Sequence, residues 1–359
     1  MLAGDLTPAM IGETPLFQLA FNCLGFDETF DAAVDVICCY IHETQEIDEN
    51  MPSISAVVTL LIALRPNLTA AIQADDSDKV RGFCRIFVEA GETYRLLLLQ
   101  HPDTFYAIVE AISECVAYSD LEIAPITFHF WFRLAQSIGK KPDVPPLYIN
   151  TYRTLLEIII AKLHFPENPE SMTAQERDEF RSFRHVMGDT LKDCCYVLGT
   201  DGCLLRTYEM ITTAMAKGAT GAGNVSWQEI EAPLFSMRSM GAEVNPHDDE
   251  IIPKIMDLIP QLPPHPRVQY ATIMVISRYT EWTDRHPSYI PFQLGFISAG
   301  FEDPDPEVAA ASGQAMKYMC KDCRQVKSSR HGLRAANLRS LASRSIPSPT
   351  THIRPNYGL

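Results

Sequence analysis

The sequence predicts an all-α protein made of antiparallel helix pairs stacked one after another. The main observation is that apolar residues recur at steps of three and four, as Val80, Phe83 and Phe87 do within residues 78–94. Few stretches alternate with the period of two that half-buried strands show. A second observation is that loops rich in Pro, Gly and Asp separate the periodic stretches, at residues 139–146, 165–173, 217–224, 261–266 and 302–306.

Each periodic stretch is long enough for a helix, and the short connections between stretches make neighbouring helices antiparallel. The predicted helices follow one another along the whole chain up to the last loop. In order, they span residues 15–24, 27–43, 52–64, 78–94, 103–118, 126–139, 147–163, 176–198, 203–215, 227–240, 249–259, 267–282, 289–300 and 306–322.

An internal repeat is visible near the C-terminal end. Aligning Pro266 with Pro306 also pairs Arg267 with Glu307, at an offset of 40 residues. The apolar positions that follow match at the same offset, and Ile230 begins a weaker copy upstream. Two helices per repeat of this length are typical of HEAT or armadillo repeats, so we predict a right-handed superhelical solenoid of about seven or eight repeats.

The helix at residues 126–139 is unusually aromatic and has two interpretations. Aromatic rings beside His129 and Arg133 could stack nucleic-acid bases. The alternative, which the surrounding repeats favour, is a helix buried on most sides. We expect one face of this helix to be buried, formed by Phe128, Trp131, Phe132, Ala135 and Ile138. A second apolar face should extend it, formed by Phe130 and Leu134.

The chain is acidic, but its charge is uneven. It has 30 basic and 45 acidic side chains, and six of the basic ones lie from Val326 onward, where no acid occurs. Residues 1–325 therefore carry 24 basic and 45 acidic groups, a net charge of −21. A body of this charge repels phosphate backbones and attracts basic partners, so we expect no direct nucleic-acid binding.

We expect three segments: residues 1–14, poorly ordered or partly helical; residues 15–325, the solenoid; and residues 326–359, a basic, Ser-rich tail without structure. We interpret the tail as the product of a translated intron or of a shifted reading frame. The alternative is a genuine disordered extension. Without a following repeat, the last helix should leave an apolar face open at Val308, Ala311, Ala315 and Met319.

The sequence shows neither a membrane-spanning segment nor a secretory signal peptide. No basic residue precedes Arg65, and the most apolar run, residues 56–64, is too short to cross a bilayer, so we expect no membrane insertion. The ten cysteines lie mostly within apolar helical patterns, which indicates buried, reduced thiols.

No motif indicates catalysis, a cofactor or a metal. The glycine-rich run at residues 218–223 lacks the Lys and Ser/Thr of a phosphate loop, so an interhelical loop is the better interpretation. Cys320 and Cys323 have the spacing of half a zinc site, but no second pair follows. We therefore expect no enzyme, and an all-α enzyme would need a cluster of His, Glu or Cys that the sequence does not supply.

Two acidic groups are the candidate partner-binding residues. The first lies on a loop and a helix start, and the second begins another helix. Negative charge at a helix start can simply stabilise the helix. The functional interpretation is a contact surface for a basic protein, formed by Glu167, Glu170, Glu176, Asp178 and Glu179, and by Asp248, Asp249 and Glu250.

Several stretches are informative in combination. These are "LFQLAFNCLG" (16–25), "FDAAVDVICCYIHETQEIDENM" (30–51), "DKVRGFCRIFVEAGETY" (78–94), "FHFWFRLAQSI" (128–138), "DEFRSFRHVMGDTLKDCCYVLG" (178–199), "WQEIEAPLFSMRSM" (227–240) and "HPRVQYATIMVISRYTEW" (265–282). Together they resemble the transportin-SR branch of the importin-β karyopherins, in particular the fungal messenger-RNA transport regulators. The resemblance runs from about residue 15 to residue 325.

The resemblance implies a nuclear import receptor that shuttles between cytoplasm and nucleus. Such a receptor binds arginine-rich, RNA-binding cargo proteins, contacts nucleoporins and releases cargo to a Ran-type GTPase. Family members are much longer, so we expect a middle segment that lacks both the N-terminal repeats with the main Ran contact and the C-terminal repeats that grip cargo. The alternative is a helical-repeat scaffold for protein complexes without a transport role.

Overall fold

The computed structural model describes residues 15–139, 141, 143–219 and 225–323. These residues form helices and turns, and no strand occurs among them. The chain divides into two compact units, one ending at Gly199 and the other beginning at Thr200. The segments predicted for residues 1–14 and 326–359 lie outside the described residues.

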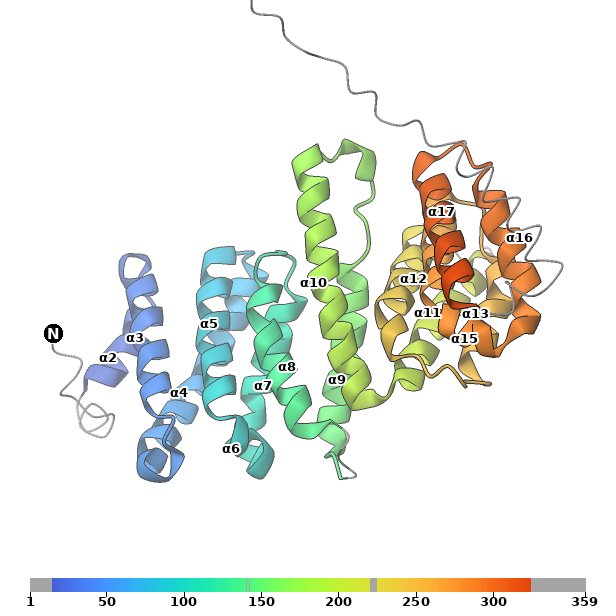
Figure 1. Cartoon of the computed structure of the whole chain (residues 1–359). Helices are drawn as coiled ribbons and strands as arrows, with labels where there is room; N and C mark the ends of the chain where they lie inside the picture. Colours follow the sequence, from blue (N-terminus) through green and yellow to red (C-terminus); the bar gives the residue numbers. More distant parts are fainter. Residues whose placement is uncertain (1–14, 140, 142, 220–224, 324–359) are drawn as a thin grey trace, which may run out of the picture. The chain divides into compact units, whose positions relative to one another are not determined.

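In the first unit, the helices form two layers of neighbours (Figure 1). One layer contains α3, α5, α8 and α10, and the other contains α4, α7 and α9, with α2 packed on α3. Bounds are α2 Leu16–Cys23, η1 Asp27–Thr29, α3 Phe30–Glu43, α4 Ile47–Gln73, α5 Ser77–Thr93, α6 Arg95–Gln100, α7 Pro102–Ala117, η2 Ala124–Thr127, α8 Phe128–Ile138, α9 Pro146–Lys162, η3 Pro169–Ser171 and α10 Ala174–Leu198.

The second unit repeats the arrangement. Helices α12, α14 and α17 pack in one row, α11 packs against α12, and α16 packs against α14 and α17. Bounds are α11 Thr200–Ala219, α12 Gln228–Met240, η4 Gly241–Glu243, α13 Ile251–Leu258, η5 Ile259–Gln261, α14 Pro266–Arg278, α15 Thr280–Arg285, η6 Pro287–Tyr289, α16 Ile290–Gly300 and α17 Pro306–Asp322.

Residues that the repeat offset aligns in the sequence contact one another in the structure. Arg267 on α14 and Glu307 on α17, aligned at 40 residues, form an ion pair with Nη1 and Oε2 2.8 Å apart. The aligned apolar residues Val268 and Val308 are both buried. The all-α fold of stacked HEAT-type helix pairs, predicted from this period, is confirmed.

Two helices differ from their predicted bounds. The helix predicted for residues 52–64 extends over residues 47–73, although it contains Pro52 and Pro66. Proline removes one backbone hydrogen bond, but a continuous stripe of buried residues on both sides of each proline holds the helix together. The helix predicted for residues 267–282 breaks at Tyr279, so that α14 and the short α15 follow one another.

Helix α4 also bears on the membrane prediction. The helix is 27 residues long, whereas the apolar run within it that the membrane prediction considered, residues 56–64, has only nine. Among the described helices, α4 alone has the length and apolar composition to cross a membrane. Its buried residues face α5 and α7, and Arg65 in its middle pairs with Glu110 and Glu114 of α7. These contacts are those of a repeat helix packed against its neighbours.

Helix α8 is buried, but its buried face is rotated from the predicted one. Phe130, Trp131, Leu134, Ala135 and Ile138 face the interior, whereas Phe132 is 45% exposed and Phe128 is partly exposed. The assignment of Phe132 to the core face was therefore wrong. Phe130 and Trp131 are fully buried and inaccessible to nucleic-acid bases, so these two rings cannot take part in a stacking platform.

The last described helix does not leave the apolar face that the sequence suggested. Val308, Ala311, Ala315 and Met319 are all at most 3% exposed. They are covered because α17 packs against both α14 and α16. The prediction that these four residues need a following repeat was wrong, since the preceding helices already bury them.

Tyrosine hydroxyls connect successive repeats. The Tyr279 hydroxyl donates to the Met237 carbonyl at 3.0 Å, and the Tyr148 hydroxyl donates to the Leu98 carbonyl. The Tyr94 hydroxyl lies 2.8 Å from the Thr44 hydroxyl. Burial raises the pKa of Tyr148 to about 12, so its hydroxyl keeps its proton and remains a donor at neutral pH.

We expect Trp131→Ala to destabilise the first unit by about 3–5 kcal/mol, because it empties a fully buried site against Tyr152. Trp131→Phe is the matched control, since it keeps a ring and removes an indole N–H that has no acceptor among the described residues. Urea unfolding followed by circular dichroism measures both. A Trp131→Ala variant as stable as the parent chain would contradict the buried placement.

We expect Gly91→Ala to destabilise the chain by about 1–3 kcal/mol. A Cβ at Gly91 would lie 2.7 Å from the Phe130 ring and 2.8 Å from Ile112 Cδ1, where α5 approaches α8 and α7. Gly202→Ala in α11 is the control, because a Cβ there meets nothing within 4 Å. Thermal unfolding should show a loss for the first variant and none for the second; equal effects would argue against close packing at Gly91.

Candidate partner-binding surfaces

The first acidic group lies where α9 connects to α10. Thr173 caps α10: its hydroxyl accepts the Glu176 backbone N–H at 3.2 Å, and the Glu176 carboxylate accepts the Thr173 backbone N–H at 2.7 Å. These hydrogen bonds lower the pKa of Glu176 and keep it ionised. Glu176 therefore performs the structural role that a helix start favours.

The other acids of this group are more available. Glu167, Glu170, Asp178 and Glu179 are all exposed. Asp178 Oδ1 lies 3.4 Å from Arg181 Nη1, and Glu179 accepts a 2.8 Å hydrogen bond from the side chain of Gln175. Exposed contacts of this kind contribute little to stability, so these carboxylates can exchange them for an external partner.

A cluster of aromatic rings around Arg184 supports the acidic loop. The Arg184 side chain is 5% exposed, and its guanidinium lies over the Phe165 ring, 4.5 Å from the centroid. Phe165 in turn meets Phe180 edge-on at 5.2 Å. Phe165 precedes Glu167 by two residues, so this cluster fixes the start of the acidic loop against α10.

The second acidic group lies in the second unit and is mostly structural. Asp248 is 8% exposed; its Oδ2 accepts the backbone N–H groups of Ile251 and Ile252 at 2.9 and 2.6 Å. Its carbonyl accepts the Trp282 indole N–H at 2.7 Å. Asp248 thus caps α13, and its carboxylate cannot face a partner.

The neighbours of Asp248 point outward. Asp249 Oδ1 lies 2.9 Å from His286 Nε2, and the His286 ring stacks on Trp282 with 4.1 Å between centroids. Glu250 is exposed. Of the three acids predicted here, Asp249 and Glu250 are accessible, and the two acidic groups belong to different units.

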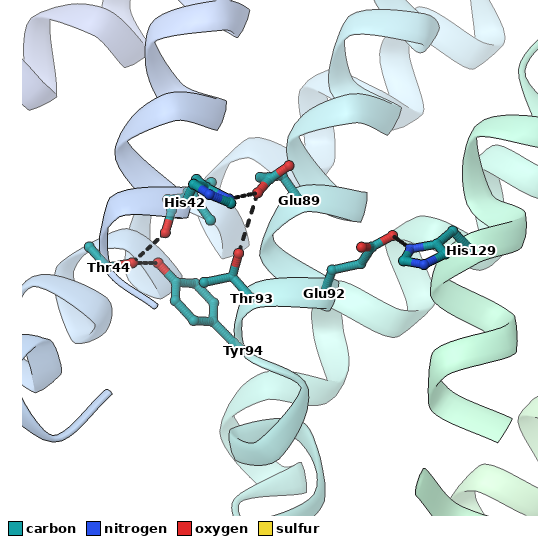
Figure 2. Close-up of polar contacts among 8 residues, drawn as sticks. His42, Thr44, Glu89, Glu92, Thr93, Tyr94 and His129 are labelled. Carbon is teal, nitrogen blue, oxygen red and sulfur yellow. Dashed lines mark hydrogen bonds and ion pairs between the residues drawn. The ribbon is translucent and has the colours of Figure 1, made fainter. Parts of the chain in front are cut away.

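Polar pairs between repeats were missed by sequence reasoning. Figure 2 shows two of them: His42 Nδ1 lies 3.1 Å from Glu89 Oε1, and His129 Nδ1 lies 2.8 Å from Glu92 Oε1. Both glutamates come from α5, while the histidines come from α3 and α8. Their separations of 47 and 37 residues are close to one repeat, and this offset was the signal that could have found them.

The cysteines and the other ionisable side chains form no metal site in the part of the chain that the structure describes. No group of three or more His, Cys, Asp or Glu there could hold a metal ion. All ten cysteines are free thiols, and seven are buried. Cys323 lies against the Thr280 carbonyl and the Met319 sulfur, and burial raises its pKa to about 12, so it is an unreactive core thiol.

Comparison with protein families agrees with this architecture. Residues 75–162 match the second TPR domain of the Transportin-3/Importin-13 family, and residues 249–334 match its third TPR domain. The second match extends past residue 325, where the sequence analysis ended the solenoid. The two matches fall in different units and in the order of the family's domains.

Relatives are similar over most of this chain. An uncharacterized protein of Schizosaccharomyces pombe is 36% identical over 328 residues, which is 87% of this chain and 34% of the relative. The mRNA transport regulator MTR10 of Saccharomyces cerevisiae is 33% identical over 329 residues, 86% of this chain and 33% of the relative. The chain thus spans about a third of the length of these relatives.

A solved structure of importin-13 in its cytosolic state has the same fold. It aligns with a TM-score of 0.77 and 16% identity, covering 98% of this chain and 43% of that one. The stacked helix pairs, the two domain matches and the relatives therefore agree. The chain belongs to the transportin branch of the karyopherin-β family.

Proposed function

We propose that the chain is a segment of a nuclear import receptor that binds basic, RNA-binding cargo proteins and is regulated by a Ran-type GTPase. The receptor would shuttle between cytoplasm and nucleus. The observation that supports this most is family membership together with an acidic body. A relative is named as an mRNA transport regulator, and residues 1–325 here carry a net charge of −21.

The charge distribution supports arginine-rich cargo as the substrate class. Glu167, Glu170, Asp178 and Glu179 form an acidic edge at the start of α10, anchored by the Arg184 cluster. Asp249 and Glu250 add accessible carboxylates in the second unit. Carboxylates accept the paired N–H groups of arginine side chains, so an arginine-rich segment can satisfy several of them at once.

We expect the chain to bind an arginine–serine peptide weakly, with an affinity that falls as salt rises. Neutralising Glu167, Glu170, Asp178 and Glu179 to Gln or Asn should weaken binding only in part, because many acids contribute and each exposed pair contributes little. Glu176 is left intact because it caps α10. Fluorescence anisotropy over a salt series measures the effect.

The matched control neutralises four exposed acids at the other end of the unit, Glu28, Asp31, Glu43 and Asp48. A local acidic edge predicts a larger loss from the α10 set than from this control. Equal losses would mean that only overall charge matters. No binding of the peptide by the parent chain would count against basic cargo and favour the scaffold interpretation.

A pull-down with GTP-loaded and GDP-loaded Ran tests the regulatory part of the proposal. The resemblance assigns the main Ran contact to repeats that precede this segment in the family. We therefore expect no stable, nucleotide-dependent capture of Ran by the chain alone at physiological salt. Strong GTP-dependent capture would show that this segment itself carries the Ran-binding surface.

A further inference from the structure

Two arginines follow the contact between α5 and α8: Arg95 at the start of α6, and Arg133 on α8. The Glu92–His129 pair joins α5 to α8, and Gly91 of α5 also lies against Phe130 of α8. Arg95 follows Glu92 by three residues, and Arg133 follows His129 by four. Arg95 is the first residue of α6, directly after the end of α5, and Arg133 lies one turn beyond His129 on α8, so both arginines follow the Glu92–His129 pair.

Neither guanidinium has an ionic partner within the described part of the chain. Arg65, Arg81 and Arg85 in the same unit form ion pairs, whereas Arg95 and Arg133, like Arg153 and Arg177, form none with any described residue. The pKa of Arg95 lies below its usual range because of partial burial and then because of Arg133, opposed only by Glu92. Glu92 is already engaged by His129.

Exposed apolar side chains flank the arginines. Phe132 on α8 is 45% exposed and adjoins Arg133, and Leu96 on α6 is 57% exposed and adjoins Arg95. Phe132 is the ring that the sequence had placed in the core. Exposed rings and arginines are enriched at the centres of protein interfaces, where one supplies apolar area and the other directed hydrogen bonds.

The charge of this patch identifies its partner. A chain with 45 acidic and 30 basic residues could pair each arginine with a neighbouring acid, yet these two repel one another unpaired. A carboxylate is the group that a guanidinium binds in a bidentate manner. The net charge of −21 on residues 1–325 opposes a long polyanion such as a nucleic acid more than a short segment with a few carboxylates, so a short acidic segment is the favoured partner.

We propose that the surface formed by Arg95, Leu96, Phe132 and Arg133 binds an acidic peptide segment of a partner protein. The guanidiniums hold its Asp or Glu carboxylates, and Phe132 and Leu96 contact an adjacent apolar side chain. This surface is separate from the acidic edge at α10 and takes a partner of opposite charge. The inference therefore stands independently of the basic-cargo proposal.

The test measures binding of a short fluorescein-labelled peptide of alternating glutamate and leucine to the full chain by anisotropy. Removing both charges with Arg95→Gln and Arg133→Gln should weaken binding by about tenfold or more, since a hydrogen bond to a charged group contributes about 1.5–3 kcal/mol. Phe132→Ser should weaken binding severalfold without changing its salt dependence. Arg133→Gln alone, at an exposed position, separates binding from folding, which circular dichroism monitors.

The matched control replaces two exposed arginines elsewhere in the unit, Arg153→Gln on α9 and Arg177→Gln on α10. It changes the net charge equally and should leave peptide affinity unchanged. A loss as large as that of the Arg95 and Arg133 pair would overturn the proposal, as would failure of the parent chain to bind the peptide. Tighter binding of a single-stranded uridine oligonucleotide than of the peptide would overturn it in favour of nucleic acid.

Discussion

The fold depends on each repeat being covered by the next, and buried tyrosines make that contact specific. An aromatic ring fills the apolar interface while its hydroxyl reaches a polar atom one repeat back, as in the Tyr279–Met237 and Tyr94–Thr44 contacts, 42 and 50 residues apart. Apolar burial alone would allow neighbouring helices to slide. A buried hydroxyl that must find its acceptor allows one register, because leaving it unpaired costs about 1–3 kcal/mol.

The helical architecture was predictable because the sequence shows two periodicities: apolar residues recur with the period of a helix, and whole helix pairs recur with the period of a repeat. The period of three and four placed every long helix, and the offset of 40 residues aligned Arg267 with Glu307, which form an ion pair in the structure. Local signals failed where packing between repeats overrode them. The apolar pattern predicted a helix over residues 52–64, yet α4 extends over Ile47–Gln73 and contains Pro52 and Pro66, because its neighbours bury residues on each side of both prolines.

The rotation of a helix is harder to predict than its existence. In α8 nearly every residue from 128 to 135 is apolar, so periodicity could not decide which side faces the core. The close approach of α5 at Gly91 decides it, by bringing Phe130 inward and leaving Phe132 outside. Similarly, three consecutive acids at residues 248–250 looked equivalent, but the cap of α13 uses Asp248 and leaves the next two free to face solvent.

The first unit thus carries an acidic edge at the start of α10. It also carries two arginines, Arg95 on α6 and Arg133 on α8, that form no ion pair with any described residue. Some charges of this unit are neutralised by partners about one repeat away, as Arg85 is by Asp35 and Arg81 is by Glu122. Charges that remain after this pairing are the ones able to recognise other molecules, because a partner gains their full interaction without breaking an internal one. In this unit the charge pairs join neighbouring helices, and the surfaces proposed for binding consist of charges that take no part in those pairs between repeats.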